Sequence, residues 1–166
     1  MSDTRTAPAA PAPADTPAPA GQVTALAPLA PAEAAARLRT GGTRGFLDLD
    51  PVTQNDALIV RLLAEQDATV FAHGDALVGA RPNPGNPRQA VVATTSADPE
   101  PLAALAEFLR VYRRHTSLVA VTGADEPART ALAASGFTEV GVLRGHWYRS
   151  GAYHDAHLHH LPLEPQ

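Results

Sequence analysis

The stretch AASGFTEVGVLRGHWYRSGAYHD, residues 133–155, decides the fold of this chain of 166 residues. Gly136 ends a short helical run, since glycine readily adopts the left-handed conformation that terminates helices. Two long runs with β-branched and aromatic side chains follow, at 138–148 and 152–161, and Ser150-Gly151 lies between them. The stretch therefore predicts a helix followed by a long β-hairpin.

Working toward the N-terminus, the hydrophobic pattern predicts further helices and strands. We expect helices at 31–40, 51–66, 98–115 and 127–135, and strands near Val23 and at 68–73, 76–80, 89–95 and 117–122. The proline-rich segment 81–87 is predicted to be a stiff connecting loop, with a substrate-binding loop as the alternative. The resulting order predicts an α/β (α+β) fold, with a mixed central sheet of about six to seven strands flanked by helices.

Composition divides the chain into two regions and excludes several classes of protein. Residues 1–21 are almost entirely Ala, Pro, Thr and Asp, which predicts a disordered tail before a single domain at 22–166. The net charge of −4 argues against a nucleic-acid partner, and the absence of cysteine excludes disulfides. No apolar run is long enough for a membrane span or a signal peptide, so we expect a cytoplasmic protein.

Three short motifs near the C-terminus resemble the endings of GNAT (Gcn5-related N-acetyltransferase) domains. They are the Gly136-Phe137 pair after a helix, the sequence Gly141-Val142-Leu143-Arg144-Gly145-His146, and the sequence Tyr153-His154-Asp155. The order of predicted elements is similar to that of the same family, of which the chain looks like a divergent member. The resemblance implies an N-acetyltransferase that uses acetyl-CoA and acts on a small-molecule or peptide amine.

The resemblance also implies where the acyl donor would lie. It would run along the end of the central strand, at Val92 and Thr94, pass Ser96 in the next loop and reach Asp125, which can also cap the following helix. The family holds the donor's diphosphate on a glycine-rich loop that opens the next helix. Here that place reads Ser96-Ala97-Asp98-Pro99-Glu100-Pro101, which has no glycine, two carboxylates and two prolines without N–H groups. These residues predict a well-started helix rather than a phosphate site.

The residues for proton transfer also depart from the family pattern. Leu132 stands where the resemblance implies a tyrosine that acts as the general acid, and the central strand holds no residue that could act as the general base. The nearest substitutes are His146, Tyr148 and Tyr153 on the last two strands, and these are our candidate catalytic residues. They can equally be side chains that fill half-buried strands.

The last strand is rich in histidine. Asp155, His157 and His159 share one face because side chains alternate along a strand, and such spacing can bind zinc or nickel. Histidine-rich strands are more often only solvated, so we expect no metal site.

Two functional hypotheses follow from these observations. The chain is either a GNAT-like N-acetyltransferase or a degenerate, non-catalytic domain of that fold that binds a protein or a small ligand. An open cleft between the strands at 91–94 and 118–121 would favour the enzyme, and Leu102 or Leu132 filling that space would favour the binding module. The long terminal strands also make a homodimer possible.

Overall fold

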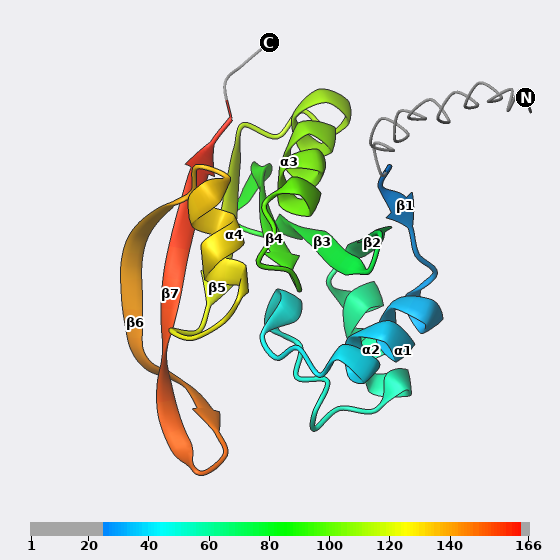
Figure 1. Ribbon diagram of the computed structural model, residues 1–166, viewed down its shortest axis with the longest axis vertical. Coiled ribbons are helices and arrows are strands. Elements are labelled where there is room, and N and C mark those ends of the chain that lie inside the picture. Colours follow the sequence, from blue (N-terminus) through cyan, green and yellow to red (C-terminus); the bar gives the residue numbers. More distant parts are fainter. Residues whose placement is uncertain (1–24, 164–166) are drawn as a thin grey trace, which may run out of the picture.

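The computed structural model describes residues 25–163, which form seven strands and four α-helices (Figure 1). The elements, in chain order, are β1 (Ala27–Pro28), α1 (Pro31–Gly41), the 3-10 turn η1 (Phe46–Asp48), α2 (Asp56–Glu65), β2 (Thr69–His73), β3 (Ala76–Asn83), β4 (Asn86–Thr94), α3 (Glu100–Tyr112), β5 (Ser117–Thr122), α4 (Ala128–Ala134), β6 (Thr138–Arg149) and β7 (Ala152–Pro162). The strand expected near Val23 and the tail expected at 1–21 lie outside the described residues. None of the described helices is long and apolar enough to cross a membrane.

All seven strands join one mixed sheet in the order β1-β2-β3-β4-β5-β7-β6. Only the pair β4–β5 is parallel, because α3 carries the chain back across the sheet between these two strands. The predicted mixed α/β sheet is therefore confirmed, and its strand number is seven.

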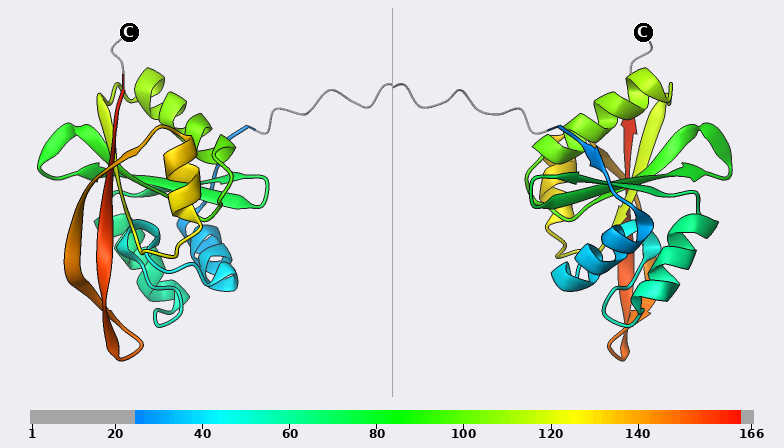
Figure 2. Two further views of the ribbon diagram at one scale, coloured as in Figure 1. Left: turned by 60° about the vertical axis from the view of Figure 1, so that its left-hand side comes forward. Right: turned by 90° about the vertical axis from the view of Figure 1, so that its right-hand side faces the viewer.

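The helices cover both faces of the sheet (Figures 1 and 2). On one face, Leu102, Leu105 and Leu109 of α3, with Leu132 of α4, pack on β3, β4 and β5. On the other face, α1, η1 and α2 build a second core with β2 and β3. The hairpin β6–β7 extends beyond the other strands, and its tip lies far from α3 (Figure 2).

Two local predictions are wrong. Segment 81–87 is not a loop, because β3 continues to Asn83 and β4 begins at Asn86, so that the two strands form a hairpin. The side-chain oxygen of Asn83 accepts the N–H of Gly85 and fixes this turn. The second helix begins at Asp56 rather than 51, since the side chain of Asn55 accepts the N–H of Leu58 and caps it.

Candidate functional site

The central feature of the site is the separation of the two parallel strands. Pairing between β4 and β5 ends at Val91 and Val119, although both strands continue for three more residues. Val92, Ala93 and Thr94 still pair with β3 on their other side. Their N–H and C=O groups on the β5 side therefore face open space at the point where the sheet divides.

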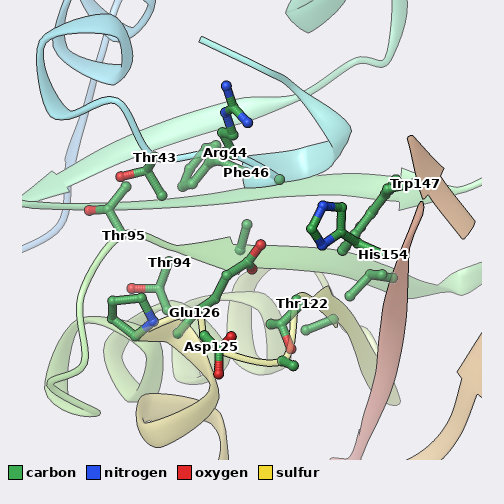
Figure 3. Close-up of a pocket in the computed structure, with 18 of the residues that line it drawn as sticks. Thr43, Arg44, Phe46, Thr94, Thr95, Thr122, Asp125, Glu126, Trp147 and His154 are labelled. Atoms are coloured by element: carbon green, nitrogen blue, oxygen red, sulfur yellow. The ribbon is translucent and has the colours of Figure 1, made fainter. Parts of the chain in front are cut away.

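A cavity of about 520 Å³ fills this division (Figure 3). Its walls come from the ends of β4 and β5, from the loop 123–127 after β5 and the first residue of α4, from residues 42–46, and from the end of β6 and the start of β7. Leu132 forms part of the wall, whereas Leu102 is buried in the core and does not line the cavity. The space between the strands is thus open, which is the arrangement that we expected of an enzyme.

Glu126 extends from the loop after β5 toward the middle of the cavity (Figure 3). Two glycines leave room for it, since an added Cβ would lie 3.2 Å from its Oε1 at Gly45 and 2.9 Å from the same atom at Gly123. Gly45 also has a φ of 81°, a conformation that other residues rarely adopt. The carboxylate is therefore held at the meeting point of two backbone segments.

Two arginines connect the walls of the cavity. Arg149 on β6 lies with Nη1 3.5 Å from Oε1 of Glu126, and its guanidinium stacks 4.0 Å from the ring centre of Trp147. Arg44 lies with Nε 3.3 Å from Oδ1 of Asp50 and donates a hydrogen bond of 3.1 Å to the Ser150 hydroxyl. These contacts join the loop 42–50 to the tip of the β6–β7 hairpin.

A break in the β6–β7 ladder positions the residues near that tip. The register shifts between Leu143 and Trp147, and the N–H of Gly145 donates to Oδ1 of Asp155 at 2.7 Å. Irregularities of this kind bend a strand and redirect its side chains. Beyond the shift, Trp147 and Arg149 line the cavity while Tyr148, which lies between them, points away.

The loop before α3 uses its own side chains to satisfy its backbone donors. The N–H of Ser96 donates to the Thr94 hydroxyl at 3.2 Å, and the N–H of Asp98 donates to the Ser96 hydroxyl at 2.9 Å. The N–H of Glu100 donates to Oδ1 of Asp98 at 3.0 Å. These bonds occupy the N–H groups of the loop, but the N-cap position of α3 is Pro99, which makes no side-chain cap, so the predicted cap by Asp98 is not formed.

Three of the four predicted donor-contact residues line the cavity, namely Val92, Thr94 and Asp125. Asp125 does not cap α4, because the first residues of that helix receive no side-chain hydrogen bond, so that part of the prediction is wrong. The fourth residue, Ser96, lies outside the cavity wall, and its hydroxyl is engaged within the loop.

The three candidate catalytic residues do not line the cavity. Tyr148 and Tyr153 are 66% and 75% exposed, and their rings contact each other at 5.1 Å between centroids. His146 is exposed beside Trp147, with 5.9 Å between ring centroids. The neighbouring His154, by contrast, lines the cavity and places Nε2 3.2 Å from the carbonyl oxygen of Arg149.

Two further histidines of β7 have side-chain partners within the protein. Nε2 of His159 lies 3.0 Å from the Thr122 hydroxyl, and Nδ1 of His157 lies 3.2 Å from Oε2 of Glu139. Burial lowers the pKa of His159, because the interior disfavours its charged form. The hydrogen bond from His157 lowers the pKa of Glu139. Within residues 25–163, no group of three or more His, Asp or Glu side chains is arranged to hold a metal ion.

Several lining residues were not singled out from the sequence, among them Arg44, Glu126, Trp147 and Arg149. Glu126 directly follows Asp125 and precedes a proline, which gives no sign that its side chain enters a cavity. The only available signal was the pair of glycines, Gly45 and Gly123, which come together with Glu126 only in the folded chain.

No protein-family model and no curated protein matches the sequence. Solved structures do match the fold. RimJ of Mycobacterium smegmatis, in complex with a coenzyme A disulfide, gives a TM-score of 0.60 at 18% identity, with 82% of this chain and 80% of that chain covered. A chimera of spermidine N-acetyltransferase SpeG from Vibrio cholerae with hSSAT gives 0.63 at 13% identity, with coverage of 82% and 93%.

RimL, a ribosomal alpha-N-protein acetyltransferase in complex with coenzyme A, gives a TM-score of 0.62 at 16% identity. The alignment covers 83% of this chain and 93% of that chain. These neighbours are GNAT acetyltransferases. The chain therefore has the GNAT acetyltransferase fold, and identities this low establish the fold alone.

Proposed function

We propose that the protein transfers an acetyl group from an acyl thioester to an amine. The observation that carries this proposal is the open cleft where β4 and β5 separate, with the backbone of Val92–Thr94 unpaired on its inner side. A thioester donor with a pantetheine arm carries two amides, and an extended arm of this kind pairs well with an exposed strand edge. Most of the exposed lining of the cavity is apolar, which suits the acyl group.

Glu126 is the residue best placed to accept a proton from the amine. It is the carboxylate that reaches the middle of the cavity, and Gly45, Gly123 and Arg149 restrict its position. An amine attacks a thioester only in its neutral form, so a positioned base promotes the reaction. We therefore assign the base to Glu126 instead of His146, Tyr148 or Tyr153.

The acceptor would enter between the loop 42–50 and the tip of the β6–β7 hairpin. The cavity lining carries negative charge on Glu126, Asp125 and Asp155 and positive charge on Arg44 and Arg149. Trp147 adds an aromatic surface. This mixed lining favours a small-molecule or peptide amine with further polar groups. Spermidine and ribosomal proteins, the substrates named for the neighbours, are examples of such amines.

Acetyl-CoA is the donor that the fold family implies, and the site fits it only in part. The pantetheine arm matches the open edge of Val92–Thr94. The diphosphate has no matching cradle, because the N–H groups of Ser96, Asp98 and Glu100 are already bonded within the loop.

Two features favour a second candidate function, a non-catalytic domain that binds a small ligand in the same cleft. The N–H groups of the loop 96–100 are bonded to side chains of the loop itself, and Leu132 stands where the resemblance implies a tyrosine as general acid. In that case the cavity would hold a ligand without any reaction, and Glu126 would serve only to pair with Arg149.

The two candidates separate in a transfer assay with the full chain. The protein is incubated with an acetyl thioester and a panel of small and peptide amines, and the released thiol is measured with and without each amine. Amine-dependent thiol release that Glu126→Gln abolishes supports the transferase. Binding of the thioester with no release in the presence of any amine contradicts it and supports the ligand-binding domain.

A further inference from the structure

The segment 95–101, which joins β4 to α3, has almost no backbone donors left for an anion. The N–H of Thr95 donates to the carbonyl oxygen of Leu77, and those of residues 96, 98 and 100 donate to side chains within the loop. Pro99 and Pro101 have no N–H. Within this segment, Ala97 alone keeps an N–H for which the structure shows no acceptor.

The charges of the same segment oppose a phosphate. Asp98 and Glu100 place two carboxylates at the first turn of α3, where the helix dipole stabilises negative charge. The favourable potential of the helix end is therefore already used by the protein's own groups. A diphosphate brought to this place would meet two like charges rather than open N–H groups.

The cavity reaches only the first residue of this segment. Its wall includes Thr94 and Thr95, but no residue from 96 to 101. A donor whose arm lies along Val92–Thr94 would therefore have its thioester end enclosed by the cavity and its far end outside. The cavity can therefore bind the arm, whereas the loop 96–101 provides no binding contacts for a nucleotide attached to it.

We infer that this protein recognises its donor through the acyl-pantetheine arm alone, and that the nucleotide diphosphate of an acyl-CoA contributes little to binding. This inference rests on the proposed function, since it specifies the donor of the same cleft. The chemistry that the site selects is an acyl thioester on a pantetheine arm. That arm can be free or attached to a carrier protein.

Calorimetric titration of the full chain with two donors tests the inference. A diphosphate held by several charge-assisted hydrogen bonds would strengthen binding by more than about tenfold. We expect acetyl-CoA to bind no more than about fivefold tighter than acetyl-pantetheine, because those bonds are absent. Acetyl-CoA binding that exceeds this limit would overturn the inference. A third titrant, acetyl-phosphopantetheine on a small carrier protein, distinguishes the two sources of the arm. If it binds tighter than acetyl-pantetheine, the donor is the carrier-borne form. If the two bind equally, the donor is the free form.

A triple variant, Ser96→Ala with Asp98→Ala and Glu100→Gln, tests the cause. It frees the N–H groups of residues 98 and 100 and removes two charges, so we expect acetyl-CoA to bind at least about tenfold tighter. Binding of acetyl-pantetheine should not change. The matched control, Glu65→Gln with Glu107→Gln, removes two exposed charges from α2 and α3 away from the cleft, and should alter neither affinity.

The outcomes separate this inference from the proposed function. Tight acetyl-CoA binding in the wild type refutes the inference and leaves the transferase proposal intact. Binding of neither donor refutes the transferase proposal itself. A triple variant that folds but gains no affinity for acetyl-CoA refutes the explanation by internal capping.

Discussion

Replacing Gly79 with alanine should destabilise the protein and narrow the cleft, because the added methyl group has no space. Gly79 lies on β3 under η1, and its Cβ would stand 2.8 Å from Cζ of Phe46 and 3.0 Å from Cδ1 of Leu47. Both side chains are buried, and Leu47 is already held at a φ of 50°. The two residues therefore have little freedom to move away.

The size of the effect follows from opposing terms. Overpacking a core of this kind costs about 1–3 kcal/mol, while alanine restricts the unfolded chain and returns about 0.4–1 kcal/mol. The midpoints of these ranges leave a fall of about 1.3 kcal/mol in the free energy of unfolding, which lowers Tm by about 3–5 °C in a domain of this size. Phe46 lines the cavity, so its displacement should also weaken thioester binding.

Urea unfolding followed by the fluorescence of Trp147, the single tryptophan, measures the change. Gly85→Ala is the matched control, since Gly85 lies in the β3–β4 turn and its Cβ would meet nothing closer than 3.6 Å. The control should stay within about 0.5 kcal/mol of the wild type. Equal stabilities for the two variants would refute the packing of η1 on β3.

Three further outcomes are expected. Glu126→Gln should lower kcat by about 100- to 10,000-fold, and it should lower the free energy of unfolding by no more than about 1 kcal/mol through the lost ion pair with Arg149. Glu107→Gln, which loses an ion pair with Arg110 on the exposed side of α3, should cost a similar or smaller amount of stability and leave kcat unchanged. A fully active Glu126→Gln enzyme would exclude the assigned base. Burial lowers the pKa of His159, so its contribution to stability is complete above the unfolded pKa of about 6.5 and is lost as the pH falls from there toward the folded pKa. In unfolding experiments between neutral and mildly acidic pH, the free energy of unfolding should therefore fall less steeply for His159→Gln than for the wild type. Identical slopes for the two proteins would contradict this cause. Asn55→Ala removes the cap of α2 and should cost about 0.5–2 kcal/mol in thermal unfolding, with an unchanged Tm as the contrary result.

The order of elements was predictable because it depends on local patterns. Glycine at 136 ends a helix, and the two long runs on either side of Ser150-Gly151 form the terminal hairpin as expected. The β3–β4 hairpin was missed because three prolines between 82 and 87 suggested a loop. Pro82 and Pro87 instead lie within the paired strands, and the Asn83 side chain completes the turn at Gly85.

The candidate site was less predictable, because it depends on contacts between distant segments. Strand alternation alone does not show that the ladder shifts between Leu143 and Trp147, which brings Trp147 and Arg149 to the cavity and leaves Tyr148 outside. The position of Glu126 depends in the same way on Gly45, which is far away in the sequence. The start of α3 at Glu100 was more predictable, since prolines and acidic side chains favour a helix N-terminus locally.

The most direct test of the account is to observe the backbone amides of Val92, Ala93 and Thr94 by NMR during titration of the full chain with acetyl-pantetheine. We expect the resonances of these residues and of 120–126 to shift together and saturate, because the arm pairs with the open edge of β4. No shift at millimolar ligand, or shifts confined to the exposed face of β6, would contradict the assignment of the cleft as a thioester site.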